Sequence, residues 1–379
     1  MKRWLYPAIS ALLIAWLWLY ASSKQRPPPQ TQIAVDLSNV LNNQSGQGFA
    51  HAEKPRTFNF PEDHNAHPEY RIEWWYLTGN LKAENRHDYG YQITFFRTAL
   101  QPNPAQRQSN WASNQIWMAH LALSDIQQQK HYQAQRISRA VLGLAGIQQQ
   151  PFKIWLEDWK ITSEDDGNFP WRITAKQQSF SLDLLVNPVK PVVLQGEQGL
   201  SQKSAEPGNA SYYYSFTRLQ TTGTITVNGS SLKVLGTSWL DREWSSSALG
   251  KDQVGWDWFS LQLDQGEELM FYRIRNKSGQ SDRFTQGKWI LASAQTISLT
   301  ASDVELKPIE YWKAESGANY PISWRLRIPK LSQDLLIKAA INDQLMRTSI
   351  HYWEGAVRVF NAESTEQIGR GYLEMTGYH

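Results

Sequence analysis

The sequence contains no cysteine, and this absence excludes disulfides, a thiol nucleophile and thiolate metal sites. Its 38 basic and 35 acidic residues are interspersed, so the clustered basic face that nucleic-acid binding requires is missing. No Gly-x-Ser-x-Gly elbow, phosphate-binding loop or dinucleotide fingerprint occurs. We therefore expect a protein that uses no cofactor and no nucleic acid, and a serine-hydrolase mechanism has no support in the sequence.

Helical periodicity is also scarce after the N-terminal segment. The most helix-tolerant region, residues 127–150, is interrupted by Gly143 and Gly146. Short alternating runs dominate instead, for example residues 74–81 and 256–263, and turn signals such as Asn228-Gly229 separate such runs. Antiparallel sheets of this kind avoid exposed edges by closing into barrels, and about eight strands leave room for one small ligand.

Aromatic residues are the abundant feature, with 18 Trp and 16 Tyr in 379 residues. Aromatic side chains suit half-buried strand positions, and an indole or phenol offers both an apolar body and a hydrogen-bonding tip. These residues can fill barrel cores or line a pocket, and the composition leaves both roles open.

The second half of the chain repeats the first, aromatic by aromatic. The pair Trp159-Lys160 corresponds to Trp312-Lys313, and the downstream blocks match in the same order with a smoothly drifting offset. The further matches are Trp171-Arg172 with Trp324-Arg325, Asp183-Leu184 with Asp334-Leu335, and Trp239-Leu240-Asp241 with Tyr372-Leu373-Glu374. Loop-length differences between two copies of one fold produce such a drift. The sequence therefore predicts an all-β chain of two tandem, lipocalin-like antiparallel β-barrels related by internal duplication.

The N-terminus predicts a targeting segment followed by a tether. Lys2 and Arg3 precede an uncharged, largely apolar stretch from residue 4 to residue 23, which is either a cleaved signal peptide or a retained membrane anchor. Either alternative puts the rest of the chain in the periplasm or outside the cell, with residues 4–23 inserting in or passing through the membrane. The predicted organisation is residues 1–23 for targeting, 24–55 as a flexible linker, 56–248 as the first barrel and 249–379 as the second.

Several blocks of the sequence, at residues 67–70, 73–81, 119–125, 239–247, 255–260 and 352–355, are specific enough to compare with known families. They resemble one bacterial family, the hydroxyneurosporene synthase-like (carotenoid 1,2-hydratase-like, AttH-type) secreted proteins, and the resemblance covers nearly everything after residue 56. It implies two lipocalin-like barrels and an apolar small-molecule site within or between them. Characterised relatives include hydratases of carotenoid double bonds and cyclisation catalysts, so the resemblance does not fix a reaction.

The segment from Gly236 to Trp244 is the strongest site candidate. On a strand, Trp239, Asp241 and Glu243 share one face, and two carboxylates beside an indole form a plausible acid site. The alternative is that both carboxylates pair with arginines such as Arg97, Arg218 or Arg273 and lock the domain junction. Relative to the hydratases' His-Asp-His-Asn-Trp block, only Asp241 and Trp244 match. The two histidines are replaced by Leu240 and Arg242, which argues against carotenoid hydration itself.

Other residues are candidates for lining the pocket. His120 is expected either to be a satisfied strand histidine or to act as a base near Asp241. Trp75 is expected to close one barrel end, as in ordinary lipocalins. The histidines of residues 64–67 give too weak a spacing signal for a metal site, and none is predicted. The predicted catalytic set is Asp241, Glu243 and His120, and the predicted ligand-binding set is Glu73, Trp74, Trp75, Tyr76, Trp239, Trp244, Trp256, Trp258, Tyr272, Tyr372 and Glu374.

Three functions from different classes follow. The first is an exported binding protein that captures an apolar small molecule or lipid and works with an ABC-type membrane transporter. The second is a cofactor-free lyase or isomerase, hydratase-like, that uses Asp241 or Glu243 as acid. The third is a structural or assembly protein. We favour the binding protein, with the lyase second.

Overall fold

The protein is described by a computed structural model covering residues 35–36, 46–104, 113–165, 168–247 and 249–378. The described residues contain strands and two short 3-10 helices, η1 (Glu62–His64) and η2 (Pro329–Leu331), and no α-helix. Among these residues no helix is long and apolar enough to cross a membrane. The predicted targeting segment, residues 1–23, lies outside the described residues.

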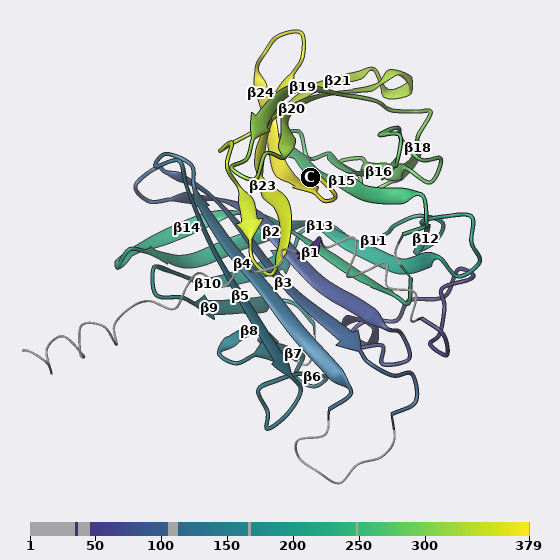
Figure 1. The fold of residues 1–379 in the computed structure, drawn as a ribbon. Helices are drawn as coiled ribbons and strands as arrows, with labels where there is room; N and C mark the ends of the chain where they lie inside the picture. Colours follow the sequence, from purple (N-terminus) through teal and green to yellow (C-terminus); the bar gives the residue numbers. More distant parts are fainter. Residues whose placement is uncertain (1–34, 37–45, 105–112, 166–167, 248, 379) are drawn as a thin grey trace, which may run out of the picture. The chain divides into compact units, whose positions relative to one another are not determined.

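The first sheet contains the strands of the N-terminal half (Figure 1). Along the sheet the strand order is β5-β4-β3-β2-β14-β13-β10-β9-β8-β7-β6, and β11 and β12 pair with β13. Its strands are β2 (Ile72–Ala83), β3 (Asp88–Ala99), β4 (Gln115–Asp125), β5 (Lys130–Arg139), β6 (Ala145–Gln148), β7 (Lys153–Leu156), β8 (Trp159–Ser163), β9 (Trp171–Lys176), β10 (Phe180–Pro188), β11 (Val193–Leu194), β12 (Leu200–Gln202), β13 (Ala210–Val227) and β14 (Ser230–Ser245).

The second sheet has the order β18-β17-β16-β15-β24-β23-β21-β20-β19, with β1 and β22 both pairing with β23. Its strands are β15 (Gln253–Leu263), β16 (Glu268–Asn276), β17 (Gln286–Ile290), β18 (Thr296–Thr300), β19 (Glu305–Lys313), β20 (Asn319–Ile328), β21 (Gln333–Ala339), β22 (Leu345–Arg347), β23 (Ile350–Asn361), β24 (Gln367–Met375) and the parallel β1 (Val35–Asp36). Part of the predicted linker, residues 24–55, thus belongs to the fold: residues 35–36 pair with β23, and the side chains of Phe49 and Ala52 are buried.

The two sheets share one topology, which confirms the duplicated fold. In each sheet the first four strands of the repeat follow one another in reverse order, as β5 to β2 and as β18 to β15. The last strand of the repeat, β14 or β24, pairs with the first one, and the remaining strands follow it in descending order. The repeated blocks also make the same contacts. Arg172 donates two hydrogen bonds to the Asp183 carboxylate, at 2.8 and 2.9 Å, and Arg325 donates two to the Asp334 carboxylate, at 2.9 and 2.7 Å. Both sheets curl into near-barrels, as lipocalin-like folds do.

Each curled sheet encloses its own hydrophobic core. Trp75, Trp117 and Trp171 are fully buried in the first core, and Trp289 and Trp324 are buried in the second. A third cluster, which includes Tyr76, Tyr213, Trp258 and Tyr372, joins the outer faces of the two sheets. This junction exists because strand alternation sends every second side chain of β2, β14, β15 and β24 away from its own barrel core.

Candidate functional site

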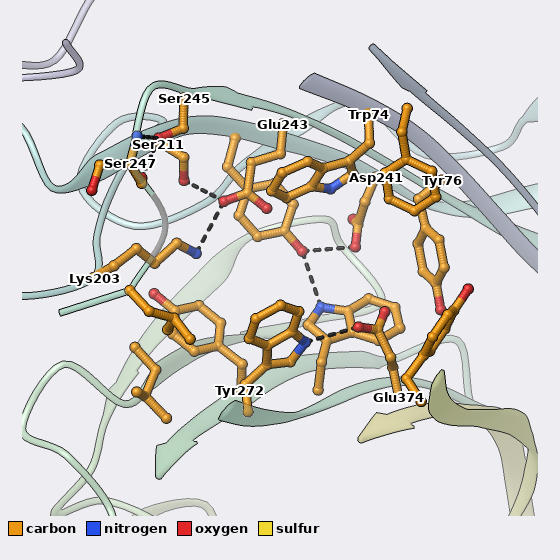
Figure 2. Close-up of a pocket in the computed structure, with 17 residues that line it drawn as sticks. Trp74, Tyr76, Lys203, Ser211, Asp241, Glu243, Ser245, Ser247, Tyr272 and Glu374 are labelled. Carbon is orange, nitrogen blue, oxygen red and sulfur yellow. Dashed lines mark hydrogen bonds and ion pairs between the residues drawn. The ribbon is translucent and has the colours of Figure 1, made fainter. Parts of the chain in front are cut away.

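A cavity of about 90 Å³ lies between the two sheets (Figure 2). On the same measure one water molecule needs roughly 10–15 Å³, so the cavity has room for several waters or a small organic group. Eight of its lining side chains are aromatic and three are carboxylates. The lining comprises Trp74, Tyr76, Phe96, Lys203, Ser211, Tyr213, Asp241, Glu243, Ser245, Ser247, Leu249, Trp256, Trp258, Tyr272, Ile274, Tyr352 and Glu374.

Asp241 on β14 accepts hydrogen bonds from three side chains. The Tyr213 hydroxyl donates at 2.7 Å, the Trp239 indole N–H donates at 2.7 Å, and the Ser215 hydroxyl also donates. The Trp258 indole N–H from the second sheet in turn donates to the Tyr213 oxygen at 3.1 Å. These bonds fix the orientation of the Asp241 carboxyl and link it to both barrels.

The electrostatic setting of Asp241 favours its neutral form. Asp241 is only 3% exposed, and no basic side chain among the described residues forms an ion pair with it. Burial raises the pKa of Asp241 to about 7, the charge of Glu243 adds to this shift, and the three hydrogen bonds oppose it. The group therefore exchanges its proton close to neutral pH, the range in which general acids and bases work best.

Glu243, two residues further along β14, has a different environment. The Lys203 ammonium lies 3.0 Å from Glu243 Oε1, and the Ser211 hydroxyl donates to the same oxygen. Lys203 also lies 4.2 Å from the centre of the Tyr272 ring. Burial disfavours the charged ammonium, but the Glu243 carboxylate and Tyr272 outweigh it and raise the pKa of Lys203. Glu243 and Lys203 thus form an ion pair at one end of the cavity.

Glu374 on β24 is the counterpart of Asp241 in the second repeat. Its Oε1 accepts a 2.9 Å hydrogen bond from the Trp256 indole, and Glu354 lies opposite it on β23. Burial is the main cause that raises the pKa of Glu374 to about 8; the charges of Asp241 and Glu243 act in the same direction, and the Trp256 hydrogen bond opposes them. Burial, followed by the Glu374 charge, also raises the pKa of Glu354 well above its ordinary range. The cavity therefore presents, from both barrels, carboxyl groups that change protonation state near pH 7 to 8.

Eight of the residues singled out from the sequence line this cavity: Trp74, Tyr76, Asp241, Glu243, Trp256, Trp258, Tyr272 and Glu374. Trp239 and Tyr372 are buried in the same junction without lining the cavity. Glu73, Trp75 and Trp244 do not line it, because alternation turns them toward the inside of the first barrel. Whether any of the lining residues binds a ligand stays a prediction.

His120 is not beside Asp241, because three strand pairings separate the two residues: β14 with β2, β2 with β3, and β3 with β4. Its Nδ1 lies 2.7 Å from the Tyr352 hydroxyl and its Nε2 lies 3.2 Å from Gln135 Oε1. It lies behind the cavity lining, against Tyr352 and Phe96. Burial lowers the pKa of His120 to about 4, which keeps the imidazole neutral at pH 7. The expectation of a histidine base next to Asp241 is therefore wrong in its geometry.

The arginines proposed as partners of Asp241 and Glu243 bind other carboxylates. Arg97 pairs with Glu73, Arg218 with Glu268 at 2.6 Å, and Arg273 with Asp257 at 2.6 Å. The alternative in which these arginines neutralise the β14 carboxylates is therefore wrong.

Sequence reasoning missed several groups of the site, among them Lys203, Tyr213, Ser215 and Glu354. Tyr213 and Ser215 share a face of β13, so alternation along residues 211–215 could have found them once β13 and β14 were paired. Lys203 follows β12 in a connecting segment, where no periodic signal identifies its partner.

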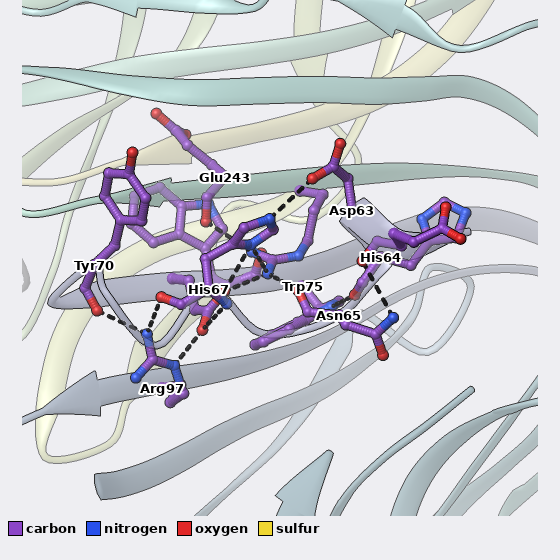
Figure 3. A network of polar contacts seen from close by, with 12 residues as sticks. Asp63, His64, Asn65, His67, Tyr70, Trp75, Arg97 and Glu243 are labelled. Atoms are coloured by element: carbon purple, nitrogen blue, oxygen red, sulfur yellow. Dashed lines mark hydrogen bonds and ion pairs between the residues drawn. The ribbon is translucent and has the colours of Figure 1, made fainter. Parts of the chain in front are cut away.

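A buried polar network lies inside the first barrel, and Figure 3 shows Arg97, His67 and Asp63 within it. Its ion pairs centre on Glu73. Glu73 is fully buried and pairs with both Arg97 and Arg242, and the backbone N–H of His67 donates to it at 3.1 Å. Burial would raise the pKa of Glu73, but the Arg242 and Arg97 guanidinium groups hold it well below its usual range. The Arg242 guanidinium also lies 3.8 Å from the centre of the Trp75 ring. Because these ion pairs lie inside the first barrel and not in the cavity lining, we interpret the network as one that stabilises the barrel.

The histidines near the network have protein partners. Both ring nitrogens of His67 are occupied, by Asp63 at 3.1 Å and by Arg242 at 3.2 Å, and its ring stacks on Trp244 at 3.8 Å. In the part of the chain that the structure describes, no group of three or more His, Asp or Glu side chains is arranged to hold a metal ion.

The fold and the cavity between its halves define a lipocalin-like two-barrel protein, and comparisons with known proteins give its family. The AttH-like family model matches residues 51–378, and the chain belongs to this family. A crystal structure of a protein described as AttH from Nitrosomonas europaea shares 37% identity with a TM-score of 0.78, covering 87% of this chain and 100% of that one.

More distant structures share the fold. Kievitone hydratase from Nectria haematococca is 16% identical with a TM-score of 0.63, covering 87% of this chain and 98% of its own. CghA, solved with Sch210972, is 11% identical with a TM-score of 0.52, covering 88% and 97%. A search of curated protein sequences found no significant match.

The Glu73 network generates a stability prediction. Glu73→Ala leaves the Arg97 and Arg242 charges buried without a counter-charge, so we expect a loss of about 3–5 kcal/mol in the free energy of unfolding by urea. The matched control is Asp183→Ala, which breaks an exposed Arg–Asp pair and should cost no more than about 1 kcal/mol. Similar losses in the two variants would contradict a structural role for the network.

Asp241 generates a pH prediction. Folded Asp241 keeps its proton to about pH 7, whereas the unfolded chain releases it near pH 4, so the folded state binds more protons between these values. Its contribution to stability is therefore complete in acid and is lost as the pH rises through about 7. Asp241→Asn should reduce the fall in unfolding free energy from pH 5 to pH 7 by about 2 kcal/mol, measured by urea denaturation at each pH. An unchanged pH slope would refute the raised pKa.

Proposed function

We propose that the protein binds an apolar small molecule in the cavity between its two barrels. The observation that carries this proposal is the lining itself, in which aromatic side chains from both repeats surround carboxyl groups whose pKa values are raised to about 7 and 8. Mostly apolar cavities with a few fixed polar groups are the usual form of a small-molecule site, and they are favoured at domain interfaces.

The aromatic lining also separates this function from a purely structural one. An assembly protein needs no apolar cavity at the junction of its repeats, but here Trp74, Trp256 and Trp258 line one. Filling that space with well-packed side chains would stabilise the junction further, so the cavity is a feature that binding explains. Similarity to CghA, whose structure was solved with Sch210972, is consistent with ligand use of this fold.

A second candidate function is general acid catalysis, and Asp241 is the observation that favours it. A neutral carboxylic acid fixed by three hydrogen bonds in an aromatic cavity can protonate a carbon–carbon double bond. The Asp241 proton would form a C–H bond with the π electrons, the aromatic rings would stabilise the resulting cation, and water would add to it. The proton released by that water would return to the Asp241 carboxylate. One solved structure with the same fold is a kievitone hydratase.

We further propose that the protein acts outside the cytoplasm. This proposal rests on Lys2, Arg3 and the apolar stretch of residues 4–23. Transfer of the bound molecule to an ABC-type membrane transporter is the partner role that we infer for such an exported binding protein.

Blocking the cavity tests the binding function. Leu249 lies in the connection between β14 and β15 and lines the cavity, so Leu249→Trp should fill it and weaken binding of the neutral fluorophore N-phenyl-1-naphthylamine by about tenfold or more. The matched control is Leu235→Trp at a position that is 65% exposed. Fluorescence titration should give wild-type affinity for the control. Equal affinity in both variants, or no binding to the wild type, would overturn the proposal.

Isotope incorporation tests the catalytic function. The wild-type protein is incubated with the apolar extract of its source organism in H₂¹⁸O, and mass spectrometry follows compounds that gain one labelled water. Asp241→Asn should lower the rate by about 10²-fold or more, the usual contribution of a general acid. Tyr213→Phe, which removes one hydrogen bond to Asp241, should have a smaller effect. Undiminished conversion by Asp241→Asn would exclude this residue as the acid.

A further inference from the structure

The cavity lining contains more carboxyl side chains than basic side chains. Its lining includes three carboxyl groups, Asp241, Glu243 and Glu374, whereas Lys203 is the one basic residue among the described lining residues. Lys203 pairs with Glu243, which leaves Asp241 and Glu374 without a counter-charge. Glu354, opposite Glu374 and only 1% exposed, adds a further carboxyl group behind the lining. A ligand could supply the missing positive charge.

One end of the cavity already holds an ammonium group. Lys203 Nζ lies 3.0 Å from Glu243 and 4.2 Å from the centre of the Tyr272 ring, and the Tyr213 ring is 5.5 Å away. A carboxylate together with aromatic faces is the combination by which proteins recognise cationic nitrogen. The Lys203 end thus shows that this cavity can stabilise a buried cation.

The other end has the same kinds of group without a cation. Asp241 and Glu374 line it from opposite repeats, and Tyr76, Trp256 and Trp258 provide aromatic rings (Figure 2). The duplication explains this pairing, because Asp241 lies opposite Tyr76 on β2 and Glu374 lies opposite Trp258 on β15.

A further carboxyl group lies behind this end of the cavity. Glu354 is 1% exposed and interacts with the Tyr76 and Tyr352 hydroxyls, and no basic side chain among the described residues forms an ion pair with it. This end of the cavity therefore has carboxyl groups from β14, β23 and β24 and no counter-charge.

We propose that this end of the cavity, between Asp241 and Glu374, receives a cationic nitrogen of the ligand. The ligand is then an apolar molecule that carries a protonated or quaternary amine. This inference rests on the proposed binding function and narrows it to a chemical class. Without the ligand, burial favours the protonated form of these carboxyl groups; with it, they become the counter-charges of the amine and release protons.

The proton release makes binding depend on pH. The titratable groups around Glu374, taken from every element packed against it, are Asp241 and Glu243 on β14, Glu354 and Tyr352 on β23, Tyr76 on β2, Tyr213 on β13, Tyr272 on β16 and Lys203. Of these, the carboxyl groups of Asp241 and Glu374 change charge near pH 7–8. Affinity for a quaternary ammonium, whose own charge is fixed, should therefore rise between pH 6 and pH 8.5.

The test compares two probes of the same shape and different charge. Benzyltrimethylammonium and neopentylbenzene differ only by a charged nitrogen in place of a carbon, and each is titrated against bound N-phenyl-1-naphthylamine. At pH 8 we expect the ammonium to displace the fluorophore at a concentration about tenfold lower than the hydrocarbon, with a smaller advantage at pH 6. In the variant Asp241→Asn/Glu374→Gln the ratio should fall to about one, whereas the exposed Asp183→Asn control should keep the wild-type ratio.

The outcomes separate the two proposals. Displacement by the hydrocarbon at equal or lower concentration, or by neither probe, overturns the cationic class while the binding function stands. A pH-independent ratio also overturns it. Failure of N-phenyl-1-naphthylamine to bind the wild-type protein would instead remove the binding function itself.

Discussion

Burial of Asp241 without a counter-charge is the constraint on which the chemistry of this protein depends. In water a carboxyl group is ionised at pH 7, but the aromatic junction raises the pKa of Asp241 to about 7. Three donors fix its position, and one of them, Tyr213, is itself fixed by Trp258 of the second barrel. The same junction therefore joins the barrels and creates a carboxyl group that can exist in either protonation state.

The first barrel also buries a carboxyl group, but there ion pairs keep the group charged. Glu73 is more deeply buried than Asp241, but two guanidinium groups and a backbone N–H keep it ionised. A carboxylate with such partners is costly to disturb and has no proton to give. The contrast is between a carboxylate that ion pairs keep charged and a carboxyl group that burial tends to protonate, although both belong to strands that pair directly with each other in one sheet.

The sequence predicts the fold well because the duplication carries two independent signals. The repeated aromatic blocks identify corresponding strands, and the alternation of Trp239, Asp241 and Glu243 assigns them to one face. The structure places Asp241 and Glu243 in the cavity lining and Trp239 directly behind it. The same alternation puts Glu73 and Trp75 on one face of β2, and Trp244 on the face of β14 opposite to Asp241, but it does not say which face turns toward the first core.

The remaining features depend on contacts that strand periodicity does not encode. Lys203 forms its ion pair with Glu243 from a connecting segment, and His120 forms a hydrogen bond with Tyr352 across the two sheets. Glu354 lies opposite Glu374 only because β23 pairs with β24. Each requires the mutual placement of distant segments. The pKa values depend on these placements too, since burial is their largest cause.

The most direct measurement is the infrared C=O stretching band of protonated carboxylic acids, recorded as a function of pH for the intact protein. We expect the wild type to retain such a band at pH 6, and the band to weaken as Asp241 and Glu374 lose their protons between about pH 7 and pH 8. Asp241→Asn and Glu374→Gln should each remove part of it. A spectrum without any protonated carboxyl group above pH 5 would contradict the account, because the cavity would then be permanently charged.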